Sequence, residues 1–172
     1  MHNIKSEIFA NDSYYIELTP DGNVYKYYYI NNAPKNDTGN PKLFFSSPDI
    51  IDISINGSIA FLDKNEKVAL YTESTNKQEE IGFVHNAKSL ALSYNQSNDE
   101  YEYYVLTANN ELYVKGSFSG EEIGGNQVIS KDKFVKVEGI PDVNKIQIGR
   151  ISTTNGRLFT QVNICNKDEN IY

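Results

Sequence analysis

A repeat of about 44 residues constrains the fold of this chain more than any other feature. Leu18, Leu62 and Leu106 lie 44 residues apart, and each begins a short segment rich in turn-forming residues. An apolar residue then follows each turn with spacings of 44, 44 and 46, at Val24, Val68, Leu112 and Leu158. A fixed period of this length is typical of repeat architectures in which each repeat is one small structural unit.

The turn segments predict β-hairpins. Asp21-Gly22, Asn109-Asn110 and Asn155-Gly156 are residue pairs that tolerate the positive φ of a two-residue hairpin turn. Asn65-Glu66 is the weakest of the four, because glutamate resists the left-handed conformation, and a type I turn with a bulge would accommodate it. Tyrosine, valine, isoleucine and leucine flank the turns, which favours strands on both sides. We therefore expect hairpins that turn at Gly22, Glu66, Asn110 and Gly156.

Further apolar segments recur between the hairpins. Residues 50–55, 87–92 and 143–149 are each suited to the innermost strand of the next unit. A shorter apolar stretch precedes each of them, at residues 43–45, 82–84 and 134–137. No window of ten residues shows a sustained helical period, so we expect an all-β chain with almost no helix. The pattern predicts a single domain, 1–172, of four units at about 8–52, 53–88, 89–142 and 143–172.

The third unit resembles the repeat of the regulator of chromosome condensation family. The resemblance covers residues 104–149 and rests on Glu111-Leu112-Tyr113, the glycine-rich segment 120–125, and the run from Ile140-Pro141 to Gly149. Lys115 stands where that family has tryptophan. The resemblance implies a seven-bladed β-propeller, but four units are too few for seven blades. We therefore predict about four propeller-type blades in a partial or degenerate propeller, with a β-trefoil as the alternative.

Composition narrows the classes of function. The formal net charge of −7 makes nucleic acid and anionic membranes poor partners, because both need a basic surface. One cysteine, Cys165, excludes an internal disulfide framework, and His2 and His85 leave little material for metal or acid–base chemistry. We expect no enzyme activity and no cofactor. No signal peptide or apolar run long enough to span a membrane is visible, so we expect a cytoplasmic or otherwise intracellular protein.

Two groups of side chains are candidates for binding a partner. Tyr27 and Tyr29 follow the first hairpin, where alternation along the strand should leave some tyrosine exposed, although packing on a sheet is the favoured explanation of these tyrosines. The second group lies in loops, where paired carboxylates could bind Ca²⁺ or simply be solvated. Its members are Asp99, Glu100, Tyr101, Glu121 and Glu122.

The sequence favours a non-catalytic protein–protein interaction module, with function in loops on a rigid scaffold. The expected partner is another protein, or a second copy that covers the open sheet edges. The family resemblance implies an alternative, a guanine-nucleotide exchange factor or regulator of a Ran-type small GTPase. A carbohydrate-binding β-repeat protein or toxin component is a third hypothesis, which needs exposed aromatic side chains near polar loops.

Overall fold

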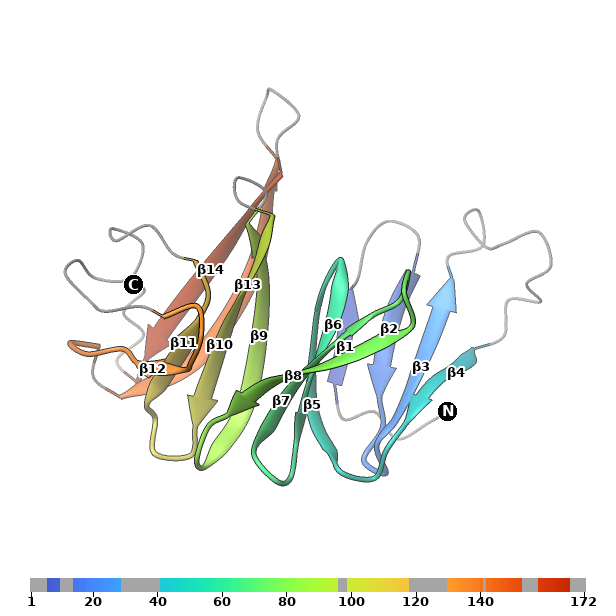
Figure 1. Ribbon diagram of the computed structural model, residues 1–172, viewed down its shortest axis with the longest axis horizontal. Coiled ribbons are helices and arrows are strands. Elements are labelled where there is room, and N and C mark those ends of the chain that lie inside the picture. Colours follow the sequence, from blue (N-terminus) through green and yellow to red (C-terminus); the bar gives the residue numbers. More distant parts are fainter. Residues whose placement is uncertain are drawn as a thin grey trace.

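A computed structural model describes residues 6–9, 14–28, 41–95, 99–117, 130–140, 142–152 and 158–167 of the chain. Fourteen β-strands and no helix are found among these residues. The strands form three four-stranded sheets and one two-stranded sheet, all antiparallel between neighbours (Figure 1). This architecture confirms the predicted all-β class.

Each sheet takes its strands in chain order, and we call the sheets blades 1 to 4. Blade 1 contains β1 (Ser6–Phe9), β2 (Tyr14–Leu18), β3 (Asn23–Tyr28) and β4 (Lys42–Ser46). Blade 2 contains β5 (Ile50–Asn56), β6 (Ser58–Asp63), β7 (Lys67–Thr72) and β8 (Lys77–Phe83). Blade 3 contains β9 (Ala87–Asn95), β10 (Glu100–Thr107), β11 (Leu112–Lys115) and β12 (Val135–Lys136). Blade 4 contains β13 (Val143–Ser152) and β14 (Leu158–Asn166).

Three of the four predicted hairpins are present, each between the second and third strand of its blade. Gly22, Glu66 and Asn110 all have positive φ, at 79°, 67° and 63°. Glu66 can adopt this conformation because the Asp63 carboxylate accepts hydrogen bonds from the backbone N–H groups of Asn65 (2.8 Å) and Lys67 (3.0 Å), which holds the turn closed. The turn-forming residues therefore predicted the position of these three hairpins correctly.

The fourth hairpin differs from the prediction. The segment 153–157, which contains Gly156, lies outside the described residues, but it joins β13 to β14, the first two strands of its blade. The other three turns join second and third strands. Leu158 is therefore not the structural equivalent of Val24, and the 46-residue spacing does not continue the repeat. A turn-forming pair specifies a hairpin, but not which hairpin of a blade it closes.

Three apolar cores lie between successive blades. Leu18 belongs to the core between blades 1 and 2, Leu62 to the next and Leu106 to the third, and all three side chains are almost inaccessible to solvent. The 44-residue period thus places the same side chain at the same depth of each interface. Separate meanders joined in this way are propeller-type blades, and the alternative of a β-trefoil is wrong.

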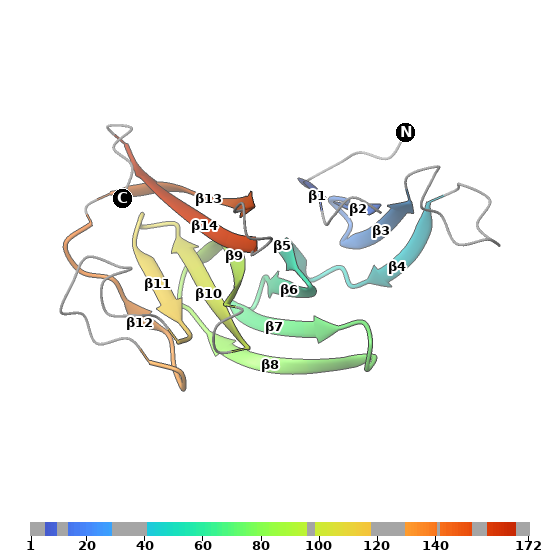
Figure 2. The ribbon, with the colours of Figure 1, turned by 90° about the horizontal axis from the view of Figure 1, so that it is seen from above.

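The first strands of the blades lie next to one another (Figure 2). β1 contacts β5, β5 contacts β9, and β9 contacts β13. Two polar side chains of β5, in blade 2, bond to the backbone of β9, in blade 3. Asp52 Oδ2 accepts a hydrogen bond from the Leu90 N–H (2.8 Å), and Ser54 Oγ accepts one from the Leu92 N–H (2.9 Å). These two hydrogen bonds join blade 2 to blade 3.

Candidate interaction surface

The strand ends form two opposite rims. The lower rim in Figure 1 carries the turns at Gly22, Glu66 and Asn110 together with the links between blades. The opposite rim carries the turn between β9 and β10, where Asp99 and Glu100 lie. The two rims carry different sets of polar contacts.

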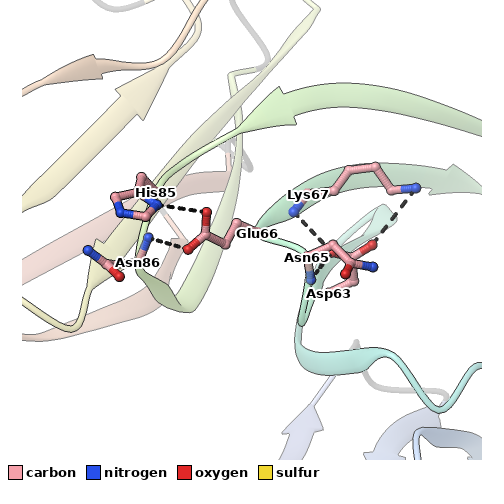
Figure 3. Close-up of polar contacts among 6 residues, drawn as sticks. All are labelled: Asp63, Asn65, Glu66, Lys67, His85 and Asn86. Atoms are coloured by element: carbon pink, nitrogen blue, oxygen red, sulfur yellow. Dashed lines mark hydrogen bonds and ion pairs between the residues drawn. The ribbon is translucent and has the colours of Figure 1, made fainter.

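On the lower rim, ion pairs tie the β6–β7 turn to the links on both sides of blade 2. Lys64 pairs with Asp49 in the preceding link. Glu66 lies against the following link, with its Oε2 3.0 Å from Nδ1 of His85 and its Oε1 accepting a hydrogen bond from the Asn86 N–H at 2.7 Å (Figure 3). These charges are used within the chain, so this part of the rim serves the assembly of the blades.

The same contacts perturb the titration of Glu66. The hydrogen bond with His85, followed by that from the Asn86 backbone, lowers the pKa of the Glu66 carboxyl below its usual value. Both partners stabilise the ionised carboxylate more than the protonated acid. The carboxylate is therefore charged across the neutral pH range and keeps the turn in contact with the link.

On the opposite rim, the β9–β10 turn gathers aromatic and charged side chains. The Tyr94 hydroxyl donates a hydrogen bond to Asp99, and the Tyr94 ring lies 5.1 Å from the Tyr101 ring between centroids. Glu100 is paired with Lys131 at 2.7 Å, and this hydrogen bond lowers the pKa of Glu100. We call these five residues the rim cluster.

Two members of the rim cluster were not identified from the sequence. Tyr94 and Asp99 are 5 positions apart, and Asp99 has a φ of 58°. Lys131 is 31 positions from Glu100, so no local pattern connects them. The Asp99 interaction raises the pKa of the Tyr94 hydroxyl, which therefore stays protonated and remains a donor at neutral pH. The only sequence signal for Tyr94 is its place before the turn that contains Asp99.

Tyr101 has a different role from its neighbours in the rim cluster. Its ring packs against the core between blades 2 and 3, and its hydroxyl donates a hydrogen bond to Ser58 Oγ of β6 at 2.7 Å. Tyr101 therefore joins blades 2 and 3 and also packs against the Tyr94 ring. Through Tyr101, the geometry of the rim cluster depends on the interface between the blades.

Tyr27 lies in β3 of blade 1, apart from the rim cluster. Its ring stacks on Tyr15 of β2, with centroids 4.7 Å apart and planes 5° from parallel. Burial, together with a hydrogen bond to Glu17, raises the pKa of Tyr27. Alternation places these side chains on the face of blade 1 that is turned away from blade 2. Tyr29, Glu121 and Glu122 lie outside the described residues.

Neither a metal site nor a membrane-spanning helix is found in the described part of the chain. No three histidine, cysteine, aspartate or glutamate side chains there are close enough to share a metal ion. No helix in those segments is long and apolar enough to cross a membrane.

Comparison with known proteins identifies the fold. The sequence matches no protein-family model and no curated protein. One similar structure is that of BBS1N in complex with ARL6DN, soaked with mercury, with a TM-score of 0.56 and 14% identity over 98% of this chain and 50% of that one. A second, soaked with lead, has a TM-score of 0.52 and 15% identity over 96% and 48%.

These similar chains are β-propeller domains, so the comparison confirms the propeller-type fold. The present chain spans about half of their length. At this level of identity the likeness concerns the fold alone.

Proposed function

We propose that this chain is a non-catalytic protein-interaction module that presents the rim cluster on rigid propeller-type blades. The observation that carries the proposal is the set of contacts at the β9–β10 turn: the Tyr94–Asp99 hydrogen bond, the contact between the Tyr94 and Tyr101 rings, and the Glu100–Lys131 ion pair. Tyrosine is common in the centres of protein interfaces, where its ring contributes apolar area and its hydroxyl contributes a hydrogen bond. A preorganised cluster also loses little conformational entropy when it binds.

A small GTPase is the partner class that we favour. Both similar structures are complexes of BBS1N with ARL6DN, in which ARL6 is a small GTPase. The net charge of −7 gives this chain an acidic surface that suits a basic patch on such a partner. The proposal is one of binding, and it does not include nucleotide exchange.

The resemblance to the regulator of chromosome condensation repeat forms a separate hypothesis about the ancestry of blade 3. Lys115, which stands in place of the family's tryptophan, donates a hydrogen bond from Nζ to the Ile81 carbonyl oxygen of blade 2 at 2.5 Å. Lys115 thus joins blade 3 to blade 2 by a polar contact. Descent of blade 3 from such a repeat is compatible with lysine at position 115. It does not bear on which partner the chain binds.

Biolayer interferometry against a panel of small GTPases, each loaded with GDP or with a non-hydrolysable GTP analogue, tests the proposal. We expect at least one GTPase to bind in a nucleotide-dependent manner. The double substitution D99N/E100Q should weaken that binding at least fivefold, because it removes two rim charges, and asparagine tolerates the positive φ at position 99.

The matched control is D142N, which removes an exposed charge from the lower rim at another residue with positive φ, 51°. Binding that D142N weakens as much as D99N/E100Q would contradict the assignment of the rim. A panel with no binding in either nucleotide state would contradict the choice of a GTPase.

A further inference from the structure

The outer strand of blade 2, β8, is exposed along most of its length. Figure 2 shows it as the outermost strand of its blade, and it pairs only with β7. Its first four residues, 77–80, are all exposed, a run that is found in no other strand whose burial the structure describes. Successive side chains of a strand point to opposite faces, so neither blade 1 nor blade 3 covers this part of β8.

The backbone of residues 77–80 is also open on its outer side. Blades 1 and 3 both belong to this chain, and among the described residues nothing bonds to 77–80 except β7. The edge is used only beyond this stretch. There Lys115 Nζ donates its hydrogen bond to the Ile81 carbonyl oxygen, and the Phe134 ring lies 3.3 Å from where a Cβ at Gly82 would be. Residues 77–80 therefore present unpaired N–H and C=O groups to a further strand.

Two neighbouring carboxylates lie on opposite faces of this open stretch. Glu79 is opposite Leu70, which packs in the core between blades 2 and 3, so its side chain is on the face turned toward blade 3. Glu80 follows it and is on the face turned toward blade 1. Neither carboxylate has an ion pair or hydrogen bond with another described side chain, whereas Glu73 and Glu100 are each paired with a lysine. A segment along this edge would meet an unpaired negative charge on both of its faces.

An exposed aromatic side chain continues the face that carries Glu80. Phe83 is 58% exposed, which is unusual for a large apolar side chain of this protein. The register of β8 contains one extra residue, so that Glu80 is opposite Ala69 and Phe83 is opposite Lys67. Positions two apart on a strand share a face. Phe83 and Glu80 are therefore neighbours on the same face of blade 2.

We propose that the outer edge of β8 binds a short, extended, basic segment of a partner protein as an added antiparallel strand. The segment would carry lysine or arginine at the two positions opposite Glu79 and Glu80, and an apolar residue two positions before this pair, next to Phe83. Opposite charges on paired strands stabilise a sheet, and like charges directly opposite each other destabilise it. Main-chain hydrogen bonds supply the affinity of such strand addition and the side chains supply its specificity. The inference uses no residue of the rim cluster and goes beyond the proposed GTPase partner.

A second copy of this chain is a poor occupant of the edge. Each copy carries a formal net charge of −7, so pairing of two copies brings like charge together. Charged side chains on an edge strand also oppose pairing with an uncharged or an acidic strand. A basic segment is the class of strand that turns the charges of Glu79 and Glu80 into attraction.

The probe is the synthetic peptide acetyl-Thr-Val-Thr-Arg-Arg-Thr-Val-Thr with a fluorescent label at its C-terminus. Its fluorescence anisotropy is followed as the full chain is added. We expect saturable binding that becomes at least tenfold weaker when glutamate replaces both arginines. Alternate N–H groups of a paired strand point to its neighbour, so N-methylation of one alternate set of peptide residues should weaken binding at least tenfold, and N-methylation of the other set less than threefold. No saturable binding, or an equal loss with the two methylated sets, would overturn the proposal.

The double variant E79Q/E80Q removes both carboxylates from the edge and should weaken peptide binding at least fivefold. The matched control is D132N/D142N, which makes the same change in net charge at two exposed residues of blades 3 and 4 and should leave binding within twofold. Asparagine tolerates the positive φ at position 142. Circular dichroism of both variants checks that they are folded.

An equal loss of binding in D132N/D142N would show that net charge, and not the edge of β8, attracts the peptide, and would overturn the proposal. Sedimentation that showed a dimer dissociated by E79Q/E80Q would assign the edge to a second copy and would also overturn it. Because the probe is a peptide, these outcomes are distinct from those of the GTPase panel.

Discussion

Lys26 and Glu73 join blade 1 to blade 2 across 47 positions of the sequence. The ammonium Nζ of Lys26 lies 2.7 Å from Oε1 and 3.0 Å from Oε2 of Glu73, in the turn that follows β7. The Lys26 side chain is only 7% exposed, whereas that of Glu73 is 46% exposed. The same ammonium lies 3.9 Å from the centroid of the Tyr14 ring and 5.6 Å from that of Phe44.

This environment decides the protonation of Lys26. Burial alone would lower the pKa of the ammonium, but the hydrogen bonds with Glu73 and Tyr28 outweigh burial and raise it. A lysine whose pKa is raised by folding contributes stability that is fully present below the pKa of the unfolded chain. That contribution is lost as the pH rises through the folded pKa. The ammonium of Lys26 is therefore charged at neutral pH, and it loses its proton only in strongly alkaline solution.

Replacement of Lys26 by alanine should destabilise the protein by about 1–3 kcal/mol, since it removes a mostly buried cation with its ion pair and ring contacts. The value is below that of a fully buried pair because Glu73 remains solvated. Urea unfolding followed by circular dichroism gives the free energy. K64M, which breaks the exposed pair between Lys64 and Asp49, should cost under about 1 kcal/mol. Equal costs for the two variants would contradict this reasoning.

The Glu66–His85 contact predicts that the pKa of the Glu66 carboxyl depends on His85. The pKa of Glu66 is lowered chiefly by His85, so H85A should move it upward, toward the value of an ordinary glutamate. A carboxylate with a lowered pKa stabilises the fold above its unfolded pKa, and this contribution is lost as the pH falls through the folded pKa. Carbon-13 NMR of the side-chain carboxyl group from pH 2 to 7 measures the change. A titration curve that H85A leaves unaltered would refute the assignment.

The Tyr101–Ser58 hydrogen bond predicts coupling between blades 2 and 3. Y101F and S58A should each cost about 1 kcal/mol, and the double variant should cost less than the sum by about 0.5–1 kcal/mol. A double-mutant cycle from urea unfolding measures that difference. Y94F, which removes the hydroxyl of the neighbouring tyrosine in β9, should be additive with S58A, because the Tyr94 hydroxyl bonds Asp99 instead. Additivity of Y101F with S58A would show that the two groups do not interact.

The sequence predicted the repeat because its key positions are set by burial. Leu18, Leu62 and Leu106 recur at one spacing because each fills the same site between blades, and a polar residue there would lose its hydration. The turn at Gly156 was placed in the wrong hairpin, because turn residues carry no information about the strand order around them. Local chemistry therefore predicted the units but not the topology of the last one.

The sequence identified only those members of the rim cluster that are adjacent along the chain. Asp99, Glu100 and Tyr101 are adjacent in sequence, and the structure brings them together with Tyr94 and Lys131. Lys26 could not have been interpreted from the repeat alone. It occupies the position that Leu70 has in blade 2 and Val114 in blade 3, and only the distant Glu73 explains why a charge is accepted there.

Two glycines with nearly the same φ should differ in their tolerance to alanine. Gly22 and Gly139 have φ of 79° and 80°. A Cβ at Gly22 would lie 1.8 Å from the Ser47 carbonyl oxygen, whereas a Cβ at Gly139 would meet nothing within 4 Å.

Both alanine variants should lose about 1 kcal/mol from the positive φ. G22A should lose at least a further ~1–2 kcal/mol, because the backbone around Ser47 must move and its N–H donates a 3.0 Å hydrogen bond to the Gly22 carbonyl oxygen. Urea unfolding of the two variants checks the difference. If G139A proved as destabilising as G22A, the close approach of the β2–β3 turn to the link between blades 1 and 2 would be wrong.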